Sequence, residues 1–216
     1  MARKQINYRS DAALRSVRIV PALALLALIT TGCATIPSVA PRMTAELQQK
    51  FIDREHDLAT LALWSFTGRI AMQVGNEGWS GTIHWAQQDR NYDLEIRGPI
   101  GAGTVRLNRS DQGTLLRLSN GQSFTGQDAR ELLVKHFGWD IPVDALQRWI
   151  IGRPAPLLDK QFELDELGRL LSLRQSGWDV EYKRYGRTGN FDLPEKIFAH
   201  NEQAQFRLFV DEWSTQ

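Results

Sequence analysis

Residues 63–86, LWSFTGRIAMQVGNEGWSGTIHWA, decide the fold of this chain. In the first half of this stretch, apolar residues or glycine occupy every second position, at Trp64, Phe66, Gly68, Ile70, Met72 and Val74. The second half repeats the period at Trp79, Gly81, Ile83 and Trp85. Because successive side chains of a β-strand point to opposite faces of the sheet, this period of two predicts two strands, each with one apolar face.

The same period recurs along most of the chain that follows. It is seen at Tyr92, Leu94 and Ile96, at Val105 and Leu107, at Leu116 and Leu118, at Phe162 and Leu164, at Leu171 and Leu173, at Trp178, Val180 and Tyr182, from Leu193 to Ala199, and at Phe206, Leu208 and Val210. Asn120-Gly121 is a typical hairpin turn. Parallel strands need crossovers of a dozen or more residues, so the short connections predict an antiparallel meander.

Three segments have helical instead of alternating spacing. Between Thr44 and Thr60, apolar residues recur near helical spacing, which predicts an amphipathic helix. The second helix starts with a capping-box-like pair, Thr125 and Asp128, and runs to Gly138. A third, shorter helix has Pro142 near its start and Gly152 as its stop. The last two form a helical insert within the run of strands.

These elements define the predicted fold class. We expect a mainly β protein with helices (α+β), built as an incomplete antiparallel β-barrel of about 11 strands with a helical lid. A sheet of this size with one apolar face must curl or be covered. An incomplete barrel curls the sheet, and a helical lid covers its concave face. No internal repeat or second domain is visible, so residues 43–216 are expected to form a single domain.

The first 42 residues have the composition of an export signal and a tether. Residues 1–18 contain five basic residues and one acidic residue, and the eleven residues from Ile19 to Ile29 are uncharged and apolar. This apolar run is too short to span a bilayer, which takes about 20 residues, and it predicts a cleaved signal over residues 1–32. Residues 33–42, with two prolines, are predicted to be an extended tether.

Cys33 is the only cysteine and follows the apolar run directly, after Gly32. This arrangement resembles the bacterial lipobox, which implies that Cys33 becomes the acylated first residue of a lipoprotein. Ala34 after the cysteine implies the outer membrane rather than the inner one. A free buried cysteine beside an ordinary cleavage site is the alternative. Removing residues 1–32 leaves 21 basic and 24 acidic residues, a net charge of −3, so membrane attachment would depend on acyl chains.

Several classes of function lack the residues that they need. Lys plus Arg number 26 and Asp plus Glu 25, so the charge does not favour a nucleic-acid partner. The four histidines form no metal-binding motif, and there is no GxSxG nucleophile motif. Gly101-Ala102-Gly103 lacks the third glycine of a dinucleotide fingerprint. We therefore predict no catalytic residues, no metal and no cofactor.

The apolar inner face of the predicted sheet is the first candidate site. By alternation, the residues that we assign to an acyl-binding cavity are Trp64, Phe66, Ile70, Met72, Trp79, Ile83, Trp85, Tyr92, Leu94, Trp149, Trp178 and Tyr182. A solidly filled core would show the same pattern. The sequence alone does not separate a cavity from a core.

The second candidate is the turn from Arg97 to Gly103. Gly98, Pro99, Ile100 and Gly101 place one large apolar residue, Ile100, at its tip. An exposed side chain of this size gains about 1.5 to 3 kcal/mol on entering an apolar phase, which suits brief contact with a bilayer. The alternative is a turn that folds back and buries Ile100.

The order of these motifs resembles the LolB family of outer-membrane lipoprotein receptors. The matching segments are Cys33, Trp64 with Gly68-Arg69-Ile70-Ala71, Gly98-Pro99-Ile100-Gly101, Gly138-Trp139, Ile141-Pro142, Trp149-Ile150-Ile151-Gly152-Arg153-Pro154, Gly168-Arg169, Gln175-Ser176-Gly177-Trp178, Leu193-Pro194 and Trp213. The resemblance implies a half-open barrel whose cavity receives the acyl chains of a lipoprotein from the soluble periplasmic carrier LolA. It also implies that the loop at Ile100, where Leu is familiar in the family, acts as these chains enter the outer membrane.

The expected partners are therefore the carrier LolA, the lipoprotein cargo and the outer-membrane bilayer, with the chain itself a monomer facing the periplasm. The only bound groups would be the acyl chains of the cargo, held transiently. A lipid-anchored scaffold subunit of an envelope complex, with a filled core, is the alternative. An esterase is a third reading, for which no nucleophile with a nearby base is visible.

Overall fold

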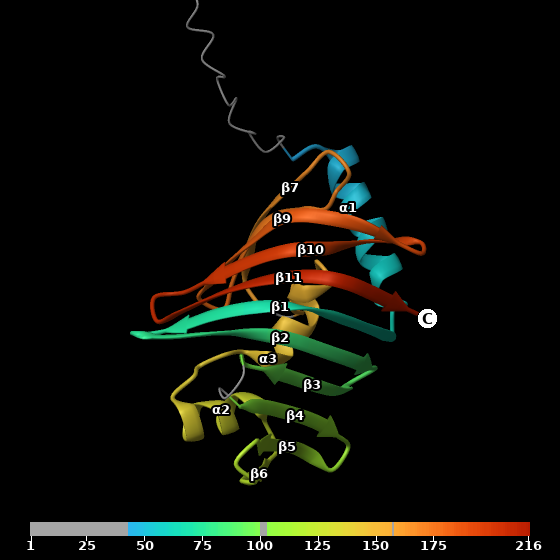
Figure 1. Cartoon of the computed structure of the whole chain (residues 1–216). Helices are drawn as coiled ribbons and strands as arrows, with labels where there is room; N and C mark the ends of the chain where they lie inside the picture. Colours follow the sequence, from blue (N-terminus) through green and yellow to red (C-terminus); the bar gives the residue numbers. More distant parts are fainter. Residues whose placement is uncertain (1–42, 100–102, 157) are drawn as a thin grey trace, which may run out of the picture. The chain divides into compact units, whose positions relative to one another are not determined.

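A computed structural model describes residues 43–99, 103–156 and 158–216 of the chain. Eleven strands form one antiparallel sheet in the order β6-β5-β4-β3-β2-β1-β11-β10-β9-β8-β7 (Figure 1). The strands are β1 Leu63–Val74, β2 Glu77–Gln88, β3 Asn91–Arg97, β4 Thr104–Ser110, β5 Gly113–Leu118, β6 Ser123–Gly126, β7 Lys160–Leu164, β8 Leu170–Gln175, β9 Trp178–Thr188, β10 Phe191–His200 and β11 Ala204–Thr215. The predicted antiparallel sheet of about 11 strands is confirmed.

The sheet consists of two meanders that meet at its centre. β1 to β6 follow one another on one side, and β7 to β11 follow one another on the other. The two halves are joined where β1 pairs with β11, from Trp64 opposite Thr215 to Val74 opposite Ala204. β6 and β7 stand at opposite edges and do not pair with each other, so the barrel is incomplete, as predicted.

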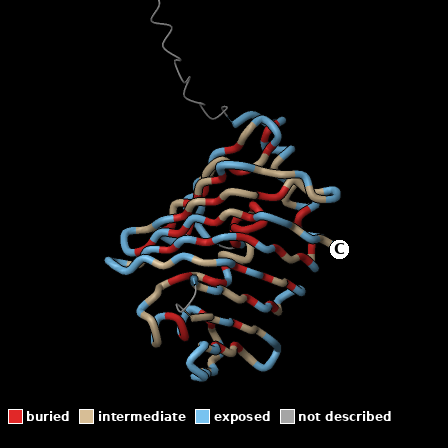
Figure 2. The backbone as a smooth tube through the Cα atoms, in the orientation of Figure 1, coloured by how far each residue is buried: buried red, intermediate tan, exposed pale blue. Residues whose placement is uncertain are grey.

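The burial pattern follows the alternation that the sequence shows. Along β1, Trp64, Phe66, Ile70 and Met72 are buried, and the residues between them are mostly exposed (Figure 2). The buried hydrophobic residues of the three helices and of every strand except β6 form one hydrophobic cluster on the inner face of the sheet. The period of two therefore places the core on one face of the sheet.

Three helices accompany the sheet: α1 Ala45–Ala59, α2 Ala129–Phe137 and α3 Val143–Ile150. α1 begins where the Thr44 hydroxyl accepts a hydrogen bond of 3.1 Å from the Leu47 amide. α2 ends at Gly138, whose φ of 71° is a conformation that glycine adopts without strain. All three predicted helices are present. None of the helices in the described part of the chain is both long and apolar enough to cross a membrane.

One detail of the predicted α2 was wrong. Thr125 belongs to β6 and does not cap the helix. The carboxylate of Asp128 is the cap, and it accepts hydrogen bonds from the amides of Arg130 (2.6 Å) and Glu131 (3.4 Å). A carboxylate at this position also interacts favourably with the positive end of the helix dipole.

The placement of α2 and α3 follows from the topology. The chain leaves the sheet at one edge, β6, and re-enters it at the opposite edge, β7. The helices between these strands therefore lie in a connection from one edge to the other, and their buried side chains join the hydrophobic cluster on the inner face of the sheet. Figure 1 shows α3 behind the central strands and α2 near β5 and β6. This insert and the inner face of the strands enclose the candidate site.

Candidate functional site: an apolar cavity under the helices

A cavity of about 70 Å³ lies between the strands and the helical insert. All of the side chains that line it are apolar: Ile70, Met72, Trp79, Ile83, Trp85, Leu94, Ile96, Val105, Leu107, Leu133, Trp139, Ile141, Val143, Leu146, Ile150, Phe206 and Leu208. They come from β1 to β4 and β11 on one side, and from α2, α3 and the segment between these helices on the other. The cavity therefore offers contacts to hydrocarbon and no charge.

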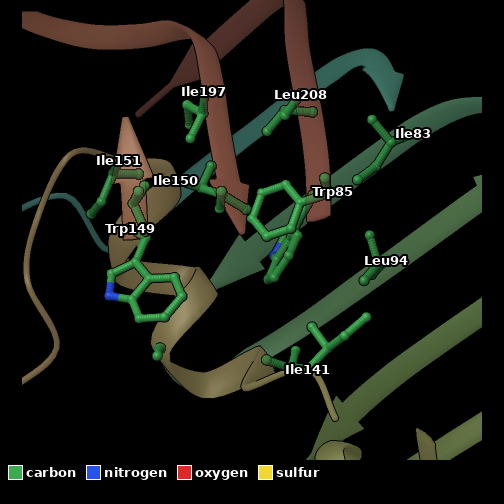
Figure 3. Close-up of a cluster of buried hydrophobic side chains, with 14 of the residues drawn as sticks. Ile83, Trp85, Leu94, Ile141, Trp149, Ile150, Ile151, Ile197 and Leu208 are labelled. Carbon is green, nitrogen blue, oxygen red and sulfur yellow. The ribbon is translucent and has the colours of Figure 1, made fainter. Parts of the chain in front are cut away.

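Helical spacing explains the wall that α3 contributes. Val143, Leu146 and Ile150 lie three and four positions apart, which brings them to one face of the helix. Figure 3 shows Ile150 facing Trp85 and Leu208 of the sheet. The short helix thus closes the cavity with aliphatic side chains.

Six of the twelve residues predicted from alternation line this cavity. They are Ile70, Met72, Trp79, Ile83, Trp85 and Leu94. Two others, Trp64 and Phe66, pack in an aromatic cluster with Trp85 and Trp213, with ring centroids 5.1 to 6.4 Å apart. Tyr92 also packs against Trp85, with the two ring centroids 5.4 Å apart. These three belong to the core beside the cavity.

The remaining three predicted residues pack around α3. The ring of Trp149 lies 6.4 Å from that of Trp178. The hydroxyl of Tyr182 donates a hydrogen bond of 3.0 Å to the carbonyl oxygen of Trp149. All three are buried, but none of them lines the cavity.

Eleven lining residues were not among those predicted. From the strands they are Ile96, Val105, Leu107, Phe206 and Leu208, and from the insert Leu133, Trp139, Ile141, Val143, Leu146 and Ile150. The alternation of β3, β4 and β11 already places the first group on the inner face. The spacing of α2 and α3 places Leu133, Val143, Leu146 and Ile150 on apolar helix faces. Strand alternation and helical spacing therefore assign most of these residues to apolar faces. They do not indicate where along an apolar face the packing leaves a cavity.

The predicted membrane loop leaves the sheet beside this cavity. Ile96 and Val105 pair across β3 and β4, and both line the cavity. Beyond them, the Gly98 amide donates a hydrogen bond of 2.9 Å to the carbonyl of Gly103 and closes the base of the loop. Gly98 and Pro99 are described, whereas Ile100 and Gly101 lie outside the described residues, as does Cys33.

Two buried tyrosines near the site stay uncharged at neutral pH. Burial, with a smaller contribution from Asp144, raises the pKa of Tyr92. Burial also raises the pKa of Tyr182 well above its usual value. Within residues 43–99, 103–156 and 158–216, no three His, Cys, Asp or Glu side chains are grouped so that they could hold a metal ion.

The fold and the cavity define the class of protein: an open antiparallel half-barrel, covered by helices, with a cavity lined by apolar side chains. The family model for the outer membrane lipoprotein LolB matches residues 62–213. The chain belongs to the LolB family.

Relatives in several bacteria agree with this assignment. The chain is 35% identical to the outer-membrane lipoprotein LolB of Nitrosococcus oceani, over 86% of this chain and 92% of the relative. It is also 35% identical to LolB of Halorhodospira halophila, over 88% and 92%. These matches confirm the predicted outer-membrane, lipid-anchored location and the prediction that the chain is not an enzyme.

Two solved structures share the fold at low identity. A domain from Vibrio parahaemolyticus, assigned to outer membrane lipoprotein sorting, matches with a TM-score of 0.52 and 9% identity over 79% of this chain and 91% of that chain. A DUF1329 family protein from Desulfovibrio piger matches with a TM-score of 0.51 and 6% identity over 80% and 94%. At these identities the likeness concerns the fold alone.

Proposed function

We propose that this protein is the outer-membrane receptor that takes lipoproteins from the soluble carrier LolA and inserts them into the outer membrane. The wholly apolar lining of the cavity is the observation that best supports this role. An acyl chain needs apolar contacts along its length and no polar partner. Membership of the LolB family supports the outer membrane as the site of action and lipoproteins as the cargo.

The cavity must widen before it can hold an acyl chain. Pockets for drug-sized ligands measure roughly 300 to 1,000 Å³, and a long acyl chain needs space of that order. The cavity measures about 70 Å³. Part of its wall therefore moves when cargo enters.

Direct handover between two cavities avoids a large energetic cost. Each acyl chain exposed to water costs on the order of 10 kcal/mol, at about 0.8 kcal/mol per CH₂ group. A receptor cavity that binds the chains more tightly than the carrier by about 1.4 kcal/mol shifts the equilibrium tenfold. Transfer from LolA therefore needs no nucleotide at this step.

Release into the bilayer is assigned to the loop of residues 98–101. The base of the loop adjoins two cavity-lining residues, Ile96 and Val105, so the loop begins and ends beside the cavity that would hold the acyl chains. Ile100 would enter the acyl region of the bilayer and give the chains an apolar path.

The chain itself would be anchored through lipid on Cys33. In this proposal residues 1–32 are removed as a signal peptide, residues 33–42 form the lipidated tether, and residues 43–216 form the single functional domain. One acyl chain binds a membrane only marginally, whereas two or more anchor it stably. The tether would keep the half-barrel beside the outer membrane as a monomer.

The test uses the full chain in proteoliposomes. LolA loaded with a triacylated lipoprotein is added without nucleotide, and cargo is followed from the carrier into the liposomes. We expect transfer that is stoichiometric with the receptor and absent from liposomes without it. No transfer from a competent carrier to the folded receptor would contradict the proposal.

Adjacent residues of α2 offer a matched pair of variants. Leu133 is buried and lines the cavity, and Val134 is 45% exposed. Leu133→Glu places a carboxylate against the cavity and is expected to abolish transfer, whereas Val134→Glu leaves it unchanged. Circular dichroism of both variants checks that they are folded.

A further inference from the structure

Two buried glutamines stand out in the apolar core. Among the residues that the structure describes, and apart from tyrosines and tryptophans, only three polar side chains are buried: Gln87, Thr114 and Gln175. Burying an amide is costly unless its donors and acceptors are paired. Both glutamines are paired, and in both cases one partner is the indole of a tryptophan.

Gln175 of β8 holds the C-terminal end of α3. Its Oε1 accepts hydrogen bonds from Nε1 of Trp149, at 3.0 Å, and from the amide of Ala155, at 2.7 Å. Its Nε2 donates to the carbonyl of Ala155, at 3.0 Å. The hydroxyl of Tyr182, on the neighbouring strand β9, donates to the carbonyl of Trp149. The end of α3 is therefore fixed to the β7–β9 side of the sheet by buried hydrogen bonds.

Gln87 of β2 connects α3 to the other half of the sheet. Its Oε1 accepts from Nε1 of Trp85, at 2.9 Å, and its Nε2 donates to Oε1 of Gln147 on α3, at 3.1 Å. An ion pair of 3.4 Å between Arg109 of β4 and Asp144 adds a contact on the same side. α3 is thus held from both halves of the half-barrel.

The adjoining segment, residues 129–142, lacks such connections. Within the described residues, no hydrogen bond joins it to any strand; its side-chain hydrogen bonds are internal or to Asp128, as in the pairing of Arg130 with Asp140. It is held to the sheet by apolar packing, such as Leu132 against Gly126, and by the stacking of His136 on Phe124. Such contacts have less directional preference than hydrogen bonds, so they permit displacement.

We propose that Gln87 and Gln175 are positioning residues that fix α3 as a strut across the half-barrel, and that α2 with residues 138–142 is the wall that moves to admit acyl chains. This segment contributes Leu133, Trp139 and Ile141 to the lining, so its displacement widens the cavity. The strut keeps the two halves of the sheet at a constant separation while the segment moves. The moving-wall half of the inference rests on the proposed function.

Hydrogen exchange of the full chain in phospholipid nanodiscs tests both parts. Without ligand, we expect slow exchange in α3 and faster exchange in α2 and residues 138–142. A tripalmitoylated cysteinyl peptide, added as the probe, is expected to change exchange in α2 and 138–142 and to leave α3 unchanged beyond its first turn, whose amides donate to the carbonyls of Ile141 and Pro142. A change confined to α3 would overturn the proposal.

Substitutions test the strut without any ligand. Gln175→Leu leaves the indole donor and the Ala155 amide without a partner, and we expect exchange at residues 149–156 to become about ten- to hundredfold faster. Trp149→Phe removes only the indole donor and should produce a smaller effect in the same direction. Gln87→Leu should speed exchange around residue 147.

Leu47→Ala is the control for general destabilisation, because it truncates a buried leucine of α1 that has no polar contact with α3. It should lower global stability without a selective effect on α3. If the glutamine variants change α3 no more than Leu47→Ala does, the strut is refuted. If the wild-type chain does not bind the lipopeptide, the proposed function and the moving wall fail, and the variants still decide on the strut.

Discussion

Trp79 and Gly81 lie on the same face of β2, and the indole ring of Trp79 packs beside the position that a side chain at residue 81 would occupy. A Cβ placed on Gly81 would lie 3.0 Å from Cη2 of Trp79 and would overlap the carbonyl oxygen of Arg97. Arg97 is the last residue of β3 before the 98–103 loop. The absence of a side chain at residue 81 therefore sets how closely β2 and β3 approach at the base of that loop.

Gly81→Val is expected to destabilise the protein by about 1 to 3 kcal/mol, because the added side chain forces the backbone of β3 away. Chemical denaturation measures this loss. Gly78→Val is the matched control on the same strand, since a Cβ at residue 78 meets no atom within 4 Å. An equal loss in both variants would mean that the contact with Arg97 is unimportant.

The core aromatics and the cavity lining should respond differently to truncation. Phe66 is 1% exposed, packs on Trp85 and Trp213 and does not itself line the cavity, so Phe66→Ala is expected to cost about 3 to 5 kcal/mol with little effect on acyl affinity. Leu94→Ala should also destabilise the fold but change binding of a fluorescent fatty acid. Denaturation and a binding titration on both variants separate the two effects. Equal changes in affinity would contradict the distinction.

Arg54 should contribute to the docking of α1. Its Nη2 donates a hydrogen bond of 2.6 Å to the carbonyl of Asp192, and its guanidinium lies 5.4 Å from the ring centre of Tyr185. Burial lowers the pKa of this guanidinium, which nevertheless stays charged at neutral pH. Arg54→Met is expected to cost about 1 to 3 kcal/mol in a denaturation experiment. Arg90→Met, at an exposed turn, should be neutral.

The ion pair within the proposed moving wall predicts a small effect of pH. The hydrogen bond from Arg130 lowers the pKa of Asp140. Because the pKa is lower in the folded protein, the contribution of Asp140 to stability is complete above the ordinary aspartate value of about 3.9 and is lost as the pH falls through the folded value. The pair is exposed, so Asp140→Asn should cost less than about 1 kcal/mol at pH 7.

Denaturation of wild type and Asp140→Asn at pH 7 and at pH 2 to 3 measures this difference, which should shrink at the lower pH. High salt should also reduce it at pH 7. Asp111→Asn, at an exposed turn, serves as the control. A difference that grows as the pH falls would have the wrong sign.

Ile100→Glu should separate acceptance of cargo from insertion. A carboxylate at the loop tip opposes entry into hydrocarbon, so we expect the variant to take lipoprotein from LolA and to fail to deliver it to liposomes. Ile100→Leu keeps size and polarity and should behave as wild type. Insertion by Ile100→Glu at the wild-type rate would exclude this role for the loop.

The strands and helices could be predicted because the spacing of apolar residues in each one matches the period of its secondary structure. The alternation at Trp64 to Met72 and the helical spacing with Gly138 as a stop correspond to observed elements. The pairing of β1 with β11 could not be predicted in the same way, since periodicity says which face a residue occupies and nothing about which distant strand lies beside it.

The cavity was predictable only in part for a related reason. Phe66 and Ile70 share one face of one strand, yet only Ile70 borders the gap. Where the gap falls depends on how the insert packs across the sheet. Gln87 and Gln175 could have been noticed, because each stands on an inner face where apolar residues are expected. Their partners on α3 depend on the tertiary fold.

The join between β1 and β11 also has a consequence for how the protein folds. Every other strand pairing in the sheet connects strands that follow one another in the chain, so each meander can form from local contacts. Only the central pairing brings together residues from near opposite ends of the domain. Because closing so long a loop is slow, we expect the folding rate to depend on this step. Until that step, a newly exported chain would consist of two half-sheets in which β1 and β11, with their aromatic side chains, are unpaired. We expect the chain to be most prone to aggregation in this state.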